Sequence, residues 1–236
     1  MAAADSGARR RSRHRRGDRD HPRVGPELLL SADLPDLARS ALEVAPELLG
    51  RVLLHRTPEG VVGVRLTEVE AYLGTGEDPG SHAHRGPTPR TAPMFGPPGS
   101  VYAYFTYGMH TCVNIVCSPT GTASAVLLRA GEVVSGEDLA MIRRGPVRSR
   151  DLARGPARLA KALGVRLTES GDPLEAAFEL LPGERPSSVA AGPRTGVSGP
   201  GGGDDFPWRF SIPGDPTVSP YRRAVPRRRP GAQPAR

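Results

Sequence analysis

Apolar and polar residues alternate along several segments of this chain, a pattern that is typical of β-strands. The segments 51–57 and 61–72 show it on either side of Pro58-Glu59-Gly60, three residues that favour a turn. Three more apolar runs, rich in β-branched and aromatic residues, follow at 101–107, 111–117 and 124–134. The pattern predicts an antiparallel β-sheet that begins with a hairpin.

Helical spacing of apolar residues marks three other segments. Asp33, followed by Pro35, is expected to cap a helix that runs to about Leu49 and that Pro46 ends or kinks. Two further helices are expected at 136–144 and 155–163, a glycine-rich loop at 183–205 and a last strand at 208–212. A sheet with separate helices predicts one mixed α+β domain.

The length and charge of the chain indicate one domain with two basic tails. Residues 1–24 hold eight Arg against three Asp, and residues 221–236 hold six Arg and no acid. Both lack hydrophobic periodicity and are predicted to be disordered, which leaves the domain at 25–220. The tails carry +11, so the chain's net +7 leaves about −4 for the domain. Basic tails attract phosphates, although solvated tails of this kind are common without that role.

Membrane and disulfide signals are weak. No segment reaches the roughly 18 apolar residues of a membrane span, and the arginine-rich start lacks the apolar core of a secretory signal. Cys112 and Cys117 lie in one predicted strand, where a disulfide between them is not expected. These features predict a soluble cytoplasmic protein without a membrane partner.

Two carboxylates and a tyrosine share one face of the predicted strand 61–72. Glu68, Glu70 and Tyr72 lie on that face because strand side chains alternate with period two. The ordinary explanation is a solvated polar face, and the alternative is a site for acid–base chemistry. The polar segment 73–99 that follows is long for a connection, and its histidines favour a functional loop.

Three of the chain's five tyrosines lie within six residues. Tyr102 and Tyr104 share a strand face, and Tyr107 stands at the Gly108 turn. Tyrosines at this spacing are often half-buried sheet residues, and the alternative is a role in stacking on a ligand or wedging into it.

The sequence gives little support for a metal site or for catalysis by a lysine. His82 and His84 form an HxH pair, and a zinc site would also need His110 and Cys112 as ligands. The spacing of these residues in the sequence does not match that of a complete zinc-binding motif. The single lysine, Lys161, has a surface position in a predicted helix, so a Schiff-base lyase reaction is not expected. Motifs of NTPases, esterases and dinucleotide-binding folds are absent from the sequence.

Several motifs together closely resemble the alkyladenine, or 3-methyladenine, DNA glycosylase family. They are LTEVEAYLG (66–74), SHAHRG (81–86), TPR (88–90), MFGPPGSVYAYFTYGMHTCVNIV (94–116), AVLLRA (125–130), GPARLAKALG (155–164), GPRTGVS (192–198), PWRF (207–210) and VS (218–219). The resemblance extends from about Leu37 to Ser219. It implies one α+β domain with a curved antiparallel sheet flanked by helices, and with a protruding β-hairpin. It also implies a monofunctional base excision repair enzyme without metal or organic cofactor, acting as a monomer on double-stranded DNA with damaged purines.

The resemblance also implies catalytic roles. The glutamate of the EAY motif, Glu70, would activate the attacking water, with Glu68 as a second candidate. Arg129 matches the arginine near the catalytic water and the DNA backbone. A carboxylate suits this reaction because cleavage of the glycosidic bond develops positive charge on the sugar.

Base recognition and DNA contact are implied by the same matching. Tyr72, His82 and Tyr104 would enclose a flipped base, and they would attract cationic alkylated purines by stacking. The amide of Asn114 at the pocket floor would clash with the exocyclic amino group of normal guanine. Tyr107, with Met109 beside it, would fill the gap left by the flipped nucleotide.

The sequence departs from the family between Tyr72 and His82, in the glycine run 199–203 and at His110, where an aromatic is common. Two other functions remain open. One is a nucleic-acid-binding module without catalysis, and the other is a metal-dependent hydrolase that uses His82, His84 and His110.

Overall fold

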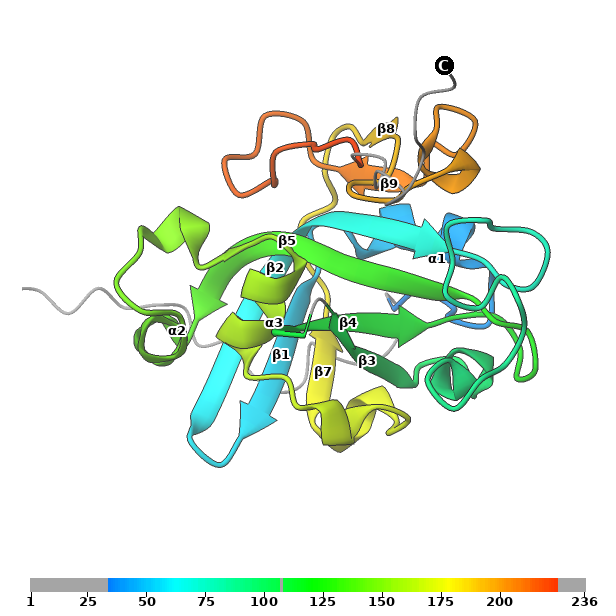
Figure 1. Cartoon of the computed structure of the whole chain (residues 1–236). Coiled ribbons are helices and arrows are strands. Elements are labelled where there is room, and N and C mark those ends of the chain that lie inside the picture. Colours follow the sequence, from blue (N-terminus) through cyan, green and yellow to red (C-terminus); the bar gives the residue numbers. More distant parts are fainter. Residues whose placement is uncertain (1–33, 107, 225–236) are drawn as a thin grey trace, which may run out of the picture. The chain divides into compact units, whose positions relative to one another are not determined.

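A nine-stranded antiparallel β-sheet organises the part of the chain that the computed structural model describes, residues 34–106 and 108–224. Its strands are β1 (Val52–Thr57), β2 (Gly60–Tyr72), β3 (Val101–Thr106), β4 (His110–Val116), β5 (Ala125–Ser135), β6 (Ala153–Arg154), β7 (Phe178–Leu181), β8 (Ala190–Gly192) and β9 (Arg209–Ser211). The main path runs β3-β4-β5-β2-β1-β7, with β6 on β5 and β9 joining β8 to β2. The long strands β2 and β5 lie side by side (Figure 1). The expected α+β class is confirmed.

The predicted first hairpin is confirmed. Strands β1 and β2 pair from Val52↔Arg65 to Thr57↔Gly60, which leaves only Pro58 and Glu59 in the loop. Gly60 has φ +138°, a backbone conformation that other residues rarely adopt. The strands β3, β4 and β5 also form where the apolar runs predict them.

A bulge in β2 exchanges the two faces of that strand. Before it, the even-numbered Val64 and Leu66 enter the core, whereas after it the odd-numbered Val69 and Ala71 do so. The pairing with β5 shifts register on both sides of Glu68. A bulge adds one residue to one strand and so reverses the alternation beyond it. The even-numbered side chains from Glu68 onward therefore face away from the core.

Three helices pack around the sheet in the described part of the chain: α1 (Ala41–Leu48), α2 (Glu137–Arg144) and α3 (Pro156–Leu163). The predictions for α2 and α3 are confirmed, but the predicted start of α1 near Pro35 is wrong. The helix begins at Ala41 because Ser40 and Glu43 form a capping box, which satisfies the free backbone N–H groups there. Pro46 lies inside the helix, which continues to Leu48.

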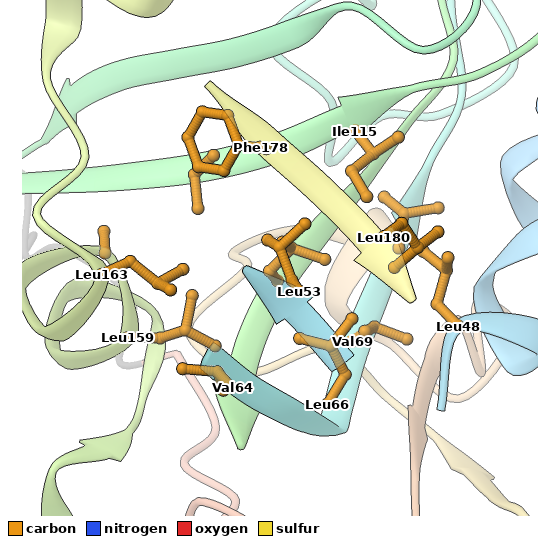
Figure 2. Close-up of a cluster of buried hydrophobic side chains, with 14 of the residues drawn as sticks. Leu48, Leu53, Val64, Leu66, Val69, Ile115, Leu159, Leu163, Phe178 and Leu180 are labelled. Carbon is orange, nitrogen blue, oxygen red and sulfur yellow. The ribbon is translucent and has the colours of Figure 1, made fainter. Parts of the chain in front are cut away.

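The hydrophobic core gathers side chains from helices and strands that are distant in sequence. Figure 2 shows Leu48 of α1, Leu159 and Leu163 of α3, and Phe178 and Leu180 of β7 around the inner strands. All of them are buried. Since burial of each such side chain contributes about 1.5–3 kcal/mol, this cluster fixes the position of β2.

Some elements were not expected from the sequence. Strand β7 pairs with β1, and β8 lies within the segment 183–205 that was predicted to be loop throughout. Both are short, so neither has enough residues to show a clear alternation of apolar and polar side chains. Among the described residues, no helix has the length and apolar character needed to cross a membrane.

Candidate functional site

A cavity of about 500 Å³ lies where strands β2, β3, β4 and β5 meet two loops and one helix end. The loops contribute residues 79–82 and 195–198, and the first turn of α3 contributes residues 155–158. Cavities of this size accommodate small organic ligands. The cavity therefore has room for a nucleobase with part of its sugar.

All four residues expected to enclose a base line this cavity: Tyr72, His82, Tyr104 and Asn114. The His82 and Tyr104 rings are perpendicular, with centroids 4.8 Å apart. The Tyr102 ring lies 5.2 Å from that of Tyr104. The strand spacing of the tyrosines thus places their rings together in one wall of the cavity, with Tyr102 buried and Tyr104 half-buried.

Asn114 is held rigidly in the wall. Its Nδ2 donates a hydrogen bond of 2.9 Å to the carbonyl oxygen of Tyr102, which is its direct partner across β3 and β4. The side chain is almost completely buried. Since a buried amide in such a bond cannot rotate freely, Asn114 presents a fixed outline to the cavity.

Glu70 is completely buried, which excludes the alternative of a solvated polar face at this residue. Its Oε2 accepts a 2.8 Å hydrogen bond from the Tyr72 hydroxyl. Its Oε1 accepts a 2.7 Å bond from the Thr195 N–H and lies 3.2 Å from Nη1 of Arg129. Tyr72, Thr195 and Arg129 line the cavity, so the carboxylate lies directly behind the cavity wall.

Glu68 is also completely buried, but its carboxylate is fully engaged elsewhere. It accepts bonds from Nε of Arg129 at 2.9 Å, from Nε of Arg209 at 2.6 Å and from the Ser219 N–H at 2.8 Å. Burial raises the pKa of Glu68, but the two arginines and Ser219 outweigh it and the pKa is lowered. Glu68 therefore anchors arginines beside Glu70.

Arg129 connects the two glutamates. It lies on β5 opposite the bulge, between the pairs Glu68↔Ala130 and Val69↔Leu128. Burial lowers the pKa of Arg129, but Glu70 and Glu68 outweigh it and raise the pKa. The guanidinium consequently carries its charge at every pH of interest, next to the cavity.

The aromatic groups of the cavity are uncharged at neutral pH. Burial and the nearby Glu70 raise the pKa of Tyr72 well above its ordinary value, and burial raises that of Tyr104. Burial and the neighbouring Arg90 lower the pKa of His82. The wall therefore offers neutral rings, and the hydroxyl of Tyr72 remains a hydrogen-bond donor to Glu70.

Of the two residues predicted to contact DNA, the structure describes Met109, which lies immediately before β4. Tyr107 falls outside the described residues. Met109 is 68% exposed and Phe105 is 47% exposed, which is unusual for large apolar side chains. Gly108, the residue before Met109, has φ +69°, a backbone conformation that favours glycine.

Within residues 34–106 and 108–224, no three histidine, cysteine or acidic residues form a group that could hold a metal ion. His110 and Cys112 line the cavity with His82, but His84 does not. Burial raises the pKa of the Cys112 thiol, which opposes the thiolate form that metals prefer.

The sequence interpretation missed several residues of this region. Thr195 supplies the backbone N–H to Glu70, and Arg209 shares Glu68 with Arg129. Arg194 and Asp78 form an ion pair with both side chains completely buried. Thr195 and Arg194 belong to the GPRTGVS motif, so the resemblance marked the segment without revealing its contacts.

A buried carboxylate beside an aromatic cavity defines a site suited to hydrolysis of a bond to a planar base. A comparison with known protein families agrees with this description of the site, because the family model described as Methylpurine-DNA glycosylase matches residues 35–216 of the chain. The chain belongs to the methylpurine-DNA glycosylase family. It is a DNA glycosylase, a hydrolase that acts on N-glycosidic bonds.

Similar proteins cover most of the chain. A protein of Leifsonia xyli subsp. xyli with the name "Putative 3-methyladenine DNA glycosylase" is 60% identical over 190 residues, which is 78% of this chain and 89% of the relative. A protein of Streptomyces avermitilis with the same name is 57% identical over 199 residues, 81% of this chain and 92% of the relative. A protein of Cutibacterium acnes, also with this name, is 51% identical over 193 residues, which is 78% of this chain and 97% of the relative.

Proposed function

We propose that this DNA glycosylase acts as a monomer on duplex DNA and hydrolyses the N-glycosidic bond of a damaged purine that has flipped into the cavity. The substrates include 3-methyladenine, 7-methylguanine, hypoxanthine and ethenoadenine. The observation that carries the proposal is the position of Glu70, whose carboxylate contacts three groups of the cavity wall, Tyr72, Thr195 and Arg129.

The proposed reaction needs one water and one base. As the bond from C1′ of the sugar to the purine nitrogen breaks, its electron pair leaves with the base and the sugar develops oxocarbenium character. The water oxygen bonds to C1′ and gives a proton to Glu70, approaching the carboxylate from the cavity side. General base catalysis of this kind contributes about 10²–10⁴-fold to a rate.

The residues that line the cavity support a purine base as its ligand. The neutral rings of His82 and Tyr104 offer faces on which a flat base can stack and edges that it can meet at a right angle. An alkylated purine carries positive charge, so it gains further attraction from the tyrosine faces. The fixed Asn114 amide supports discrimination against the amino group of normal guanine.

The product of the proposed reaction is an intact abasic site. Strand cleavage by a glycosylase requires an amine that forms a Schiff base with the sugar. The single lysine of the chain, Lys161, is exposed on α3 and does not line the cavity. We therefore assign no lyase step to this protein.

Single-turnover excision tests the proposal. Duplexes that carry one of the four lesions are incubated with the wild-type protein, with Glu70→Gln and with the control Glu175→Gln, whose side chain is exposed. Alkali then converts abasic sites to breaks. We expect alkali-dependent breaks with the wild type and the control, and at least a hundred-fold slower excision by Glu70→Gln with DNA binding retained.

Two outcomes would overturn the proposal. If no protein excises any lesion while all bind DNA, the chain acts as a binding module. If excision is lost in EDTA and restored by a metal, a metal-dependent reaction at the histidines replaces Glu70.

A further inference from the structure

Arg194 is completely buried and uses every N–H of its guanidinium. Nη1 donates to Asp78 Oδ2 at 2.6 Å and to the Ala71 carbonyl at 3.0 Å. Nη2 donates to Asp78 Oδ1 at 2.6 Å and to the Gly201 carbonyl at 2.7 Å, and Nε donates to the same carbonyl at 3.3 Å. Such a two-pronged ion pair has one strongly preferred geometry.

Asp78 extends the contacts of this pair into the loop after β2. Its Oδ2 accepts the Leu73 N–H at 3.1 Å, and its Oδ1 accepts the Gly80 N–H at 2.8 Å. The ion pair therefore joins the end of β2, the loop that leads to His82 and the segment 194–201. Each of these three segments supplies a residue of the cavity wall.

The pair contacts the Tyr72 ring directly and is linked to Glu70 through the neighbouring residue Thr195. The Arg194 guanidinium lies 4.5 Å from the centre of the Tyr72 ring and 5.0 Å from that of Trp208. The next residue along the chain, Thr195, donates its N–H to Glu70. Arg194 does not line the cavity, so it contacts Tyr72 from behind the wall.

The space around the guanidinium is closely fitted. A Cβ on Gly80 would lie 2.6 Å from Nη2 of Arg194, and a Cβ on Gly201 would lie 2.3 Å from the Gly80 nitrogen. A buried ion pair often stabilises a protein no more than well-packed apolar side chains would. The presence of a buried ion pair is therefore weak evidence for a purely stabilising role.

We infer that Asp78 and Arg194 are positioning residues for the glycosylase reaction. They hold the Tyr72 ring against the base and keep the Thr195 N–H on Glu70, without contacting the substrate. The inference rests on the proposed function of Glu70 and adds two residues to it. A loss of either partner moves the carboxylate and the stacking ring while the DNA-binding surface stays in place.

The test compares the variants Asp78→Asn and Arg194→Lys, and their double variant, with the wild type. For each protein we measure the thermal midpoint of unfolding. The single-turnover excision rate and the affinity for lesion-containing duplex are then measured at a temperature well below that midpoint. The control is Arg65→Lys, which alters an ion pair with Asp215 and Glu132 outside the cavity wall. The wild type and Glu70→Gln are measured in parallel.

We expect each single variant to excise about ten- to a hundred-fold more slowly, with affinity changed less than threefold. The double variant should be no slower than the slower single variant, because the residues act as one unit. Arg65→Lys should lower the midpoint without changing the rate.

Other results would overturn the inference. It fails if both single variants excise at the wild-type rate, or if their rate falls only in proportion to affinity. Glu70→Gln would still lose activity in that case, which leaves the proposed function intact. If the wild type itself does not excise, the proposed function fails instead. Should Arg194→Lys fail to fold, Asp78→Asn, which keeps side-chain size, decides the question.

Discussion

The hydroxyl of Tyr72 donates a hydrogen bond of 2.8 Å to Oε2 of Glu70, two residues earlier on the same strand. The two side chains lie on one face because strand residues alternate, and both stay there because the bulge at Glu68 precedes them. One tyrosine therefore lines the cavity with its ring and holds the carboxylate with its hydroxyl at the same time.

The variant Tyr72→Phe separates these two roles, since it keeps the ring and removes the donor. A hydrogen bond to a charged group contributes about 1.5–3 kcal/mol, so we expect single-turnover excision to slow by about ten-fold or more. Lesion affinity should change little. An unchanged rate would show that Tyr72 acts only by stacking. Tyr221→Phe serves as the control, because that side chain is exposed and does not line the cavity.

The lowered pKa of His82 predicts a pH effect on substrate choice. His82 is neutral at pH 7 and gains a proton only below its ordinary value of about 6.5, which places a cation in the cavity. As pH falls through the lowered pKa of His82, excision of cationic 7-methylguanine should therefore fall relative to excision of neutral hypoxanthine. The ratio cancels effects of Glu70 that both substrates share. His82→Phe should give a constant ratio, and a constant ratio in the wild type would contradict the prediction.

The buried cluster of Glu68 with Arg129 and Arg209 predicts how stability depends on pH. The folded pKa of Glu68 is below its unfolded value of about 4.5, so its contribution is complete above that pH and is lost as pH falls through the folded pKa. Glu68→Gln leaves two arginines without their carboxylate and should lower the unfolding free energy by about 3–5 kcal/mol at pH 7.

Urea unfolding at pH 7 and at a series of lower pH values measures this difference. The gap between the wild type and Glu68→Gln should narrow below pH 4.5, because the wild type then loses the same charge. A gap that stays constant into acid would mean that Glu68 contributes by packing alone. Glu132→Gln, which removes an exposed carboxylate, should show a small effect throughout.

The basic segment 1–24 lies outside the described residues, and its charge alone makes a prediction. Eight Arg against three Asp should add several phosphate contacts on DNA. Deleting it should leave single-turnover excision unchanged and flatten the dependence of log Kd on log salt by up to about five units. A titration of undamaged duplex between 50 and 200 mM salt measures the slope. If the slope is unchanged, the segment takes no part in binding.

Local pattern predicted the strands well and predicted some boundaries poorly. The sequence of β2 even shows where the bulge lies, since apolar residues occupy positions 62, 64 and 66 and then positions 69 and 71. That change of phase is a readable signal for a bulge. By contrast, the start of α1 was misplaced because two capping signals compete there, and only the Ser40–Glu43 pair closes a capping box.

The sequence by itself determined that Glu70 and Tyr72 lie on one strand face, because a period of two is a local property of an extended chain. It also determined, through its motifs, the family and four residues that line the cavity, Tyr72, His82, Tyr104 and Asn114. Only the tertiary structure decided that this face is buried and which groups hold it. Thr195 is 125 residues from Glu70, and Arg194 is 116 residues from Asp78. Partners so far apart meet only when the whole sheet forms, since no local pattern specifies contacts across that distance.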